Sequence, residues 1–436
     1  MTFNPNGIDR RVPANSDGAV PAGSVIILSA SAGAGHDGAA NELADRLRTH
    51  GFQVRLYDLA DVLPWGLGRV LRGTYRGILT RASWVYGLLF AIGNTFVGSA
   101  PATRFLLRPA RQRILDRLPA DIRLVVSTYP IASQILGPLR RDGRLSVPVV
   151  TYLTDFAVNR IWVSPGVDLH CAAHGTTRSE ALALGAGNVH VTGRMVADRF
   201  RPGSARARVR ARQRFGLPAQ GRLALLVAGS WGVGEVERTA AEIIRSRAAV
   251  PVVVCGRNAP LYRRLRRLGL GYVLGWVDDM ADLLRATDVL VENAGGLTAL
   301  EAMATGVPVA TYRPIPGHGR ANAVTMARAG VSSWIRRRKE LGPILDELIE
   351  GERGSRQREA GLRLFESDPT QWINELVRRE ERALFIPSSS HTLRALRSGM
   401  VADVASRMLT GWGVRRGRSP RRYRTRTPAR AGKRSG

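Results

Sequence analysis

The chain has 436 residues, too many for one compact core, so two domains with extensions are expected. Its 65 Lys and Arg against 35 Asp and Glu give a formal net charge of +30, which predicts an anionic partner. Two cysteines, Cys171 and Cys255, exclude a disulfide framework and fit a reducing cytosol.

Residues 1–23 are polar and lack the apolar core of a signal peptide, so a disordered N-terminus is predicted. Residues 24–200 then alternate expected strands and helices. The strand Val25–Leu28 is followed by a glycine loop and a helix that Gly51 ends, and further strands are expected at Gln53–Tyr57, Leu124–Val126 and Val147–Leu153. This alternation is typical of a parallel sheet covered by helices.

No acidic residue lies between Asp61 and Asp116, although this span is rich in arginines and interfacial aromatics. Such a composition predicts helices on an anionic membrane surface, and the alternative is a buried helical hairpin with solvated arginines. The uncharged run 82–103 contains Gly87, Gly93 and Pro101, which favours a bent or interfacial segment over a membrane span. The candidate membrane residues are Trp65, Arg69, Arg72, Arg76 and Trp84.

A basic linker, 201–214, precedes a second unit of the same plan at 215–350. Its expected strands are Leu223–Val227, Pro251–Cys255, Tyr272–Leu274 and Val289–Val291, with a glycine loop after the first. Residues 351–385 are predicted to be a closing helical region and 386–436 a disordered basic tail. The fold class is therefore α/β, with two parallel-sheet domains facing each other across a cleft.

The most informative stretch is residues 292–322, in which a strand, a glycine turn and a short helix from about Thr298 to Thr305 succeed one another. Gly295 and Gly296 let the backbone approach a ligand, and the free amides of the helix start suit a phosphate. Glu301, one turn later, is placed to accept two ribose hydroxyls, so a diphosphate beside a ribose is predicted. The alternative is a capping box between Thr298 and Glu301, which needs no ligand.

A second polar loop containing His318 and Asn322 follows the next strand, and it adds polar groups to the same sheet edge. In the first domain, His36 opens a helix and is a candidate general base for a hydroxyl. Asp155 ends a strand and could act as a base, orient His36 or cap the following turn. No His or Cys cluster has metal-ligand spacing.

Gly33, Gly35 and Gly38 also match the dinucleotide motif G-x-G-x-x-G, with Asp58 placed for a ribose. A nicotinamide oxidoreductase is therefore an alternative, but it leaves the loops of the second domain unexplained.

Several motifs together resemble the monogalactosyldiacylglycerol synthase group of glycosyltransferases, relatives of the enzyme that adds N-acetylglucosamine to lipid I. They are SAGAGHDGAA at 31–40, TDF at 154–156, TGRMV at 192–196, AGGLTALEAMATGVPV at 294–309 and PIPGHGRAN at 314–322. The resemblance spans about residues 24–385. It implies a GT-B fold of two Rossmann-like domains, a UDP-sugar held by the second domain and a lipid acceptor held by the first. No cofactor is predicted, and the sequence indicates no metal site.

The resemblance also implies roles for individual residues. His36 would be the general base, Glu301 would bind the ribose, and His318 and Asn322 would face the sugar. The diphosphate would lie on Gly295, Gly296 and Thr298, the uracil would meet Gly275, Trp276 and Val277, and the loop with Gly229, Ser230, Gly232 and Gly234 would line the diphosphate from the opposite side. Gly33 and Gly35 would belong to the acceptor side.

Two departures from the family pattern bear on specificity. His318 and Gly319 stand where relatives commonly have Gln-Glu, which leaves galactose or glucose open, and Asn159 stands where the family often has a histidine. The resulting prediction is an inverting hexosyltransferase of glycolipid synthesis that acts on diacylglycerol, peripheral at the cytoplasmic face of the plasma membrane. Its partners would be a UDP-sugar, the lipid and an anionic membrane surface, with nucleic acid not expected. The alternative is an anionic-surface binding protein with a degenerate nucleotide-sugar site.

Overall fold

The computed structural model describes residues 23–30, 34–63, 68, 77, 87–88, 107–227 and 233–385. The predictions for both tails and for most of the basic aromatic span lie outside these residues. The chain divides into a unit that ends at Glu380 and a second unit, 381–436, of which only the end of one helix is described. Both sheets lie in the first unit.

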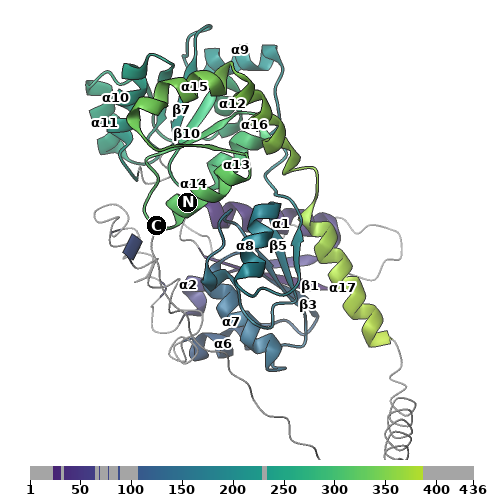
Figure 1. Cartoon of the computed structure of the whole chain (residues 1–436). Coiled ribbons are helices and arrows are strands. Elements are labelled where there is room, and N and C mark those ends of the chain that lie inside the picture. The colour runs from purple at the N-terminus through teal and green to yellow at the C-terminus, as the bar shows by residue number, and fades with distance from the viewer. Residues whose placement is uncertain are drawn as a thin grey trace, which may run out of the picture. The chain divides into compact units, whose positions relative to one another are not determined.

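The first sheet has six parallel strands in the order β2-β1-β3-β4-β5-β6 (Figure 1). Consecutive residues of β1 alternate between its two faces: Val25 and Ile27 pack against helices α1 and α17, whereas Ile26 and Leu28 pack against α2, α6 and α7. The strands are β1 Ser24–Ser29, β2 Gln53–Asp58, β3 Ile122–Ser127, β4 Val149–Tyr152, β5 Leu169–Ala172 and β6 Val189–Val191. The helices are α1 Ala34–Thr49, α2 Leu59–Val62, α6 Arg108–Leu115, α7 Pro130–Arg141, η2 Arg160–Trp162 and α8 Gly175–Ala183.

The second sheet has six parallel strands in the order β12-β11-β10-β7-β8-β9. From β7, the chain adds β8 and β9 on one side and then β10, β11 and β12 on the other, so the order of strand addition reverses between β7 and β10. Its strands are β7 Leu223–Val227, β8 Val250–Val254, β9 Tyr272–Leu274, β10 Val289–Glu292, β11 Val309–Tyr312 and β12 Ser333–Ile335. Helices α10 Val236–Ser246, α11 Ala259–Arg267 and α15 Leu341–Ile349 cover one face. Helices α12 Met280–Ala286, α13 Leu297–Ala304 and α14 His318–Arg328 cover the other. Such a reversal is where ligands of open α/β sheets bind.

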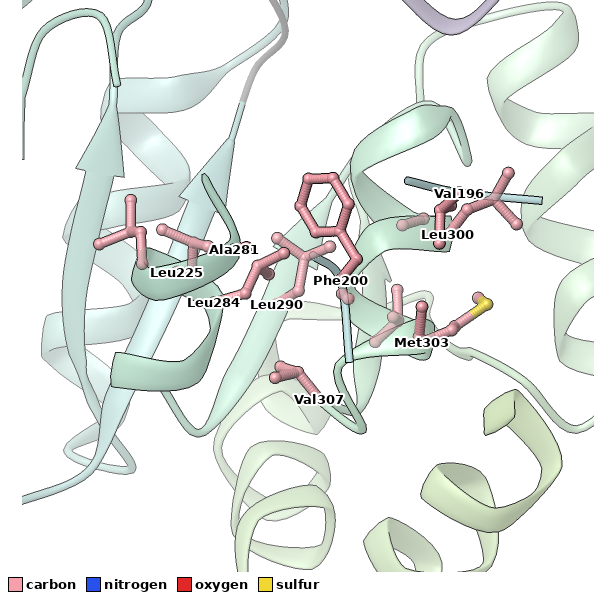
Figure 2. Close-up of a cluster of buried hydrophobic side chains, with 14 of the residues drawn as sticks. Val196, Phe200, Leu225, Ala281, Leu284, Leu290, Leu300, Met303 and Val307 are labelled. Carbon is pink, nitrogen blue, oxygen red and sulfur yellow. The ribbon is translucent and has the colours of Figure 1, made fainter. Parts of the chain in front are cut away.

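One buried cluster joins the second sheet to the segment that enters it. Figure 2 shows Leu225 of β7 and Leu290 of β10 beside α12 and α13, with Val196 and Phe200 of the entering segment among them. The same cluster includes Phe156, from the loop after β4. The hydrophobic core therefore continues from one half of the body into the other.

The chain crosses between the halves twice. Residues 201–214, predicted as the linker, contain helix α9 Ala205–Arg214, which Ser204 caps by accepting from the Ala207 amide at 3.2 Å. After α16 Glu352–Arg363, the chain returns through α17 Pro369–Phe385, whose Ile373 and Val377 pack on the first sheet. Arg46 of α1 pairs with Asp368 at 3.1 Å at this return.

The predicted two-domain α/β fold with parallel sheets is confirmed, and the predicted helix 298–305 is α13, one residue earlier at each end. The short strands β5, β6 and β12 were not predicted. A 3-10 turn, η3 Arg338–Glu340, follows β12. Within the described part of the chain, none of the helices combines the length and apolar composition that crossing a membrane requires.

Candidate active site

His36 lies in the first turn of α1, directly after the loop that follows β1. Its Nδ1 is 3.0 Å from the carbonyl oxygen of Thr128 and 2.8 Å from the hydroxyl oxygen of Thr154. A carbonyl only accepts, so Nδ1 carries the proton and donates it, which leaves the Nε2 lone pair as the basic site of the neutral ring. The ring also meets Tyr129 edge-on, with 5.0 Å between ring centroids. These contacts orient one nitrogen and leave the other to a substrate.

The loop that carries Thr154 and Asp155 is held by a buried arginine. Arg194 is 2 % exposed, and its guanidinium donates to the carbonyl oxygens of Leu153 and Asp155, the latter at 2.7 Å. It also lies 5.1 Å from the ring centroid of Phe156. No role was predicted for Arg194. Its burial next to the buried Met195 is unusual, because arginines are mostly exposed.

Asp155 and Asn322, predicted from opposite halves of the chain, are brought together. The Asp155 carboxylate accepts from Trp162 Nε1 and from Asn322 Nδ2, both at 3.3 Å. Asn322 is 1 % exposed, and its Oδ1 accepts from the Ala157 amide at 2.9 Å. The orienting contacts of His36 come from Thr128 and Thr154, so a catalytic role of Asp155 stays a prediction.

The turn 293–296 is built on a buried carboxylate. Glu292 accepts from the amides of Ala294, at 2.6 Å, and Gly295, and burial raises the pKa of Glu292. Gly295 has φ +69°, and a Cβ there would lie 2.7 Å from the Cβ of Asn322. Glycine is therefore required both for the backbone conformation and for the close approach of α14.

Helix α13 starts at Leu297 with Gly296 as its N-cap, and no side chain caps it. The capping-box interpretation of Thr298 and Glu301 is therefore wrong, because the N-cap lies two residues before Thr298. The uncapped helix start keeps its partial positive charge available to an anion.

Glu301 is only 8 % exposed, yet no described residue donates a hydrogen bond to its carboxylate. Burial raises the pKa of Glu301 to about 7, although the nearby Arg199 guanidinium opposes this rise. Buried polar groups normally have hydrogen-bond partners, so this carboxylate is suited to accept hydrogen bonds from the hydroxyl groups of a ligand.

His318 is the first residue of α14 and lies near both Asp155 and His36. Burial lowers the pKa of His318, the Asp155 carboxylate counteracts this, and the His36 ring adds to it. A Cβ on the neighbouring Gly319 would lie 2.8 Å from the carbonyl oxygen of Asn293. Any side chain at position 319 would therefore require this loop to shift. We call the region formed by His36, Thr154, Asp155, residues 293–296, Glu301, His318 and Asn322 the junction site.

Of the other predicted donor residues, those that the structure describes lie at the same edge of the second sheet. Gly234 abuts the turn, because a Cβ on it would lie 2.3 Å from Nδ2 of Asn293. Gly275, Trp276 and Val277 follow β9, where Trp276 is 51 % exposed and Arg257 lies 4.5 Å from its ring centroid. Gly35 lies in the first turn of α1. The predictions for Gly33, Trp65, Arg69, Arg72, Arg76, Trp84, Gly229, Ser230 and Gly232 lie outside the described residues.

Two residues of the dinucleotide motif, Asp58 and Gly38, have structural contacts within the chain. Asp58 caps α2 by accepting from the Ala60 amide at 2.8 Å. A Cβ on Gly38 would lie 2.5 Å from the Leu297 side chain, so this glycine serves the approach of α1 to α13. Asn159, predicted above to bear on specificity, has a structural role: it caps the 3-10 turn η2 by accepting a hydrogen bond from the Ile161 amide.

Two parallel α/β sheets whose loop edges meet at one site define the two-domain GT-B class. Solved structures agree at the level of the fold. Os79 from O. sativa, in complex with U2F and trichothecene, matches with a TM-score of 0.53 and 14% identity over 82% of this chain and 100% of that one. Acinetobacter baumannii MurG matches with a TM-score of 0.50 and 16% identity over 82% and 99%.

Comparison with protein families gives a more specific assignment than the fold does. Residues 36–196 match the monogalactosyldiacylglycerol (MGDG) synthase model, and residues 228–334 match the model of glycosyl transferases group 1. The processive diacylglycerol beta-glucosyltransferase of Bacillus subtilis (strain 168) is 28% identical over 342 residues, 75% of this chain and 87% of the relative. The predicted resemblance to MGDG synthase-like enzymes is confirmed, and the chain is a glycosyltransferase.

Proposed function

We propose that the chain is an inverting hexosyltransferase that moves glucose or galactose from a UDP-sugar to diacylglycerol. One observation carries the proposal: His36, whose ring is oriented by hydrogen bonds, lies in α1, and α1 packs against the uncapped start of α13. Helix α13 also carries Glu301, a nearly buried carboxylate to which no described residue donates a hydrogen bond. The name of the Bacillus relatives favours glucose as the sugar.

The second half supplies the donor groups. The diphosphate would lie against the turn at Gly295 and Gly296 and the first turn of α13, where backbone dipoles favour negative charge. Ribose hydroxyls would donate to Glu301, which lacks another described donor. The same dipoles would stabilise the charge that develops on the leaving diphosphate, so no metal or cofactor is invoked.

The first half supplies the base. His36 Nε2 would take the proton of the diacylglycerol hydroxyl as that oxygen attacks the anomeric carbon, while Nδ1 donates to Thr128 and Thr154. The new carbon–oxygen bond forms as the bond to the diphosphate breaks, so an α-linked donor gives a β-glycoside. The name of the relatives agrees with a β product. The Asp155 carboxylate would stabilise the imidazolium electrostatically and hold Asn322 near the sugar.

A lipid acceptor requires contact with a membrane surface. The basic aromatic segment between Asp61 and Asp116 has the composition for this contact, and we place the enzyme as a peripheral protein on the cytoplasmic face of the plasma membrane.

The decisive experiment compares His36→Ala with His50→Ala, an exposed histidine just beyond the other end of α1. Transfer from UDP-glucose and from UDP-galactose to diacylglycerol in anionic vesicles would be measured, with UDP affinity determined by titration calorimetry. We expect His36→Ala to lose about 10²–10⁴-fold in turnover with unchanged UDP affinity, and His50→Ala to keep both. Undiminished turnover of His36→Ala would refute the assignment of the base.

A further inference from the structure

A cavity of about 700 Å³ lies at the carboxyl ends of β11 and β12. Its walls combine arginines with two aromatic rings, and none of the described residues that line it is acidic; they include Tyr312, Arg313, Arg320, Trp334, Arg336 and Arg338. Sites for small organic ligands commonly have about this volume, which is far larger than a bare ion requires.

This arginine pocket is separate from the junction site, although both use α14. His318 and Asn322 are four residues apart and lie on the face of α14 toward the junction site. Arg320 and Val324 are also four residues apart, are exposed, and line the pocket. Positions two apart on a helix point in nearly opposite directions, so the helix serves two sites.

One of the four arginines, Arg313, is already paired with two carboxylates that do not line the pocket. Arg313 donates to both carboxylate oxygens of Glu242 at 3.0 Å and to Glu235 at 2.9 Å. The hydroxyl of Tyr312 also donates to Glu242, at 2.7 Å. The backbone of Arg313 has φ +52°, a strained conformation for a residue with a side chain, which these contacts hold in place.

The other three arginines have no close carboxylate partner among the described residues. Among the described residues, Arg320 and Arg336 have no carboxylate partner, and Arg338 reaches only Glu242, at 4.0 Å. The Arg336 guanidinium lies 4.5 Å from the ring centroid of Trp334, which limits its freedom. Two guanidinium groups without a carboxylate partner in the described part of the chain, and a third with only a distant one, surround this cavity. This arrangement favours a ligand with more than one negative charge, and the planar forks match phosphate oxygens.

We propose that the arginine pocket binds an organic phosphate, carrying a phosphate monoester or a diphosphate group, at a site distinct from the junction site. The shared chemistry is the phosphate, and its source is either a soluble metabolite or the headgroup of a phospholipid. The proposal does not depend on the identity of the sugar donor.

The test uses the full chain and inorganic pyrophosphate as the probe, titrated with UDP present at saturation. The variant Arg320→Gln/Arg336→Gln is compared with Arg263→Gln/Arg267→Gln, two exposed arginines of α11 that give the same change in net charge. We expect the pocket variant to bind pyrophosphate about tenfold or more weakly and the α11 variant to bind it as the parent does. Equal affinities in both variants, or full displacement of pyrophosphate by UDP, would overturn the proposal.

A separate UDP titration distinguishes failure of the proposed function from failure of the proposed phosphate site. If the parent chain does not bind UDP, the proposed function is contradicted, and the comparison of pyrophosphate affinities still tests the arginine pocket. Sedimentation with phosphatidylglycerol vesicles, against phosphatidylcholine vesicles, then distinguishes the source. Weaker sedimentation of the pocket variant than of the α11 variant indicates a lipid phosphate. Equal sedimentation, with the loss of pyrophosphate binding retained, indicates a soluble one.

Discussion

Replacing Gly295 by alanine tests the geometry on which the junction site depends. Its φ of +69° makes any side chain unfavourable by about 1 kcal/mol. The new methyl would also lie 2.7 Å from Asn322 Cβ and 2.9 Å from Met326 Sδ, an overlap that costs about 1–3 kcal/mol more. We expect Gly295→Ala to lower the free energy of unfolding by about 2–4 kcal/mol and, because the turn and Asn322 must separate, to weaken UDP binding about tenfold.

Gly330→Ala is the matched control, since Gly330 follows the same helix α14, has φ +75° and has no atom within 4 Å of its missing Cβ. This variant carries the backbone cost without the overlap, so it should lose about 1 kcal/mol and keep its UDP affinity. Urea unfolding and UDP calorimetry on both variants give the comparison. If Gly295→Ala is no less stable than Gly330→Ala, the close approach of α14 to the turn does not constrain the site.

Three further predictions concern chemistry. Burial raises the pKa of Glu301 from 4.5 to about 7. Below pH 4.5 the carboxyl is neutral in both the folded and the unfolded chain, and by pH 8 its ionisation has destabilised the ligand-free fold by about 3 kcal/mol. The variant Glu301→Gln should therefore have the same unfolding free energy as the parent at pH 4 and a higher one at pH 8, and it should bind UDP more weakly. A difference in unfolding free energy that does not change with pH would contradict the raised pKa. Thr154→Val removes one acceptor of His36 Nδ1 and should lower kcat about tenfold with UDP affinity unchanged, and an unaltered kcat would exclude this orienting role. Transfer should persist in excess EDTA, because helix dipoles rather than a metal are assigned to the diphosphate, and its loss with recovery on adding Mg²⁺ would show otherwise.

The elements that were predicted correctly share strong local patterns. Strands β1, β7 and β10 were predicted from continuous apolar runs, each followed by a glycine-containing loop. The missed strands β5, β6 and β12 have three or four residues each and contain His170, His190 and Ser333, so no continuous apolar run marks them. They are strands because the sheet beside them offers hydrogen-bond partners, as between His170 of β5 and Val189 of β6.

The role of Arg194 could not be predicted for a related reason. Arginines are mostly exposed, so the sequence does not predict that Arg194 is buried. Its acceptors, the carbonyls of Leu153 and Asp155, are about forty residues earlier in the chain. The identity of such partners depends on how the loops after β4 and β6 pack together.

The sequence by itself determined the parallel α/β architecture, the glycine turn before α13 and the candidacy of His36, because these depend on backbone preferences over a few neighbouring residues. The tertiary structure alone decided which side chains meet. His36 and Thr154 are 118 positions apart, and Asp155 and Asn322 are 167 apart. It also decided that Gly296 occupies the N-cap position of α13 and leaves the helix start uncapped, and that His318 and Arg320 lie at different sites. Contacts over such separations follow from strand register and core packing, which no local segment encodes.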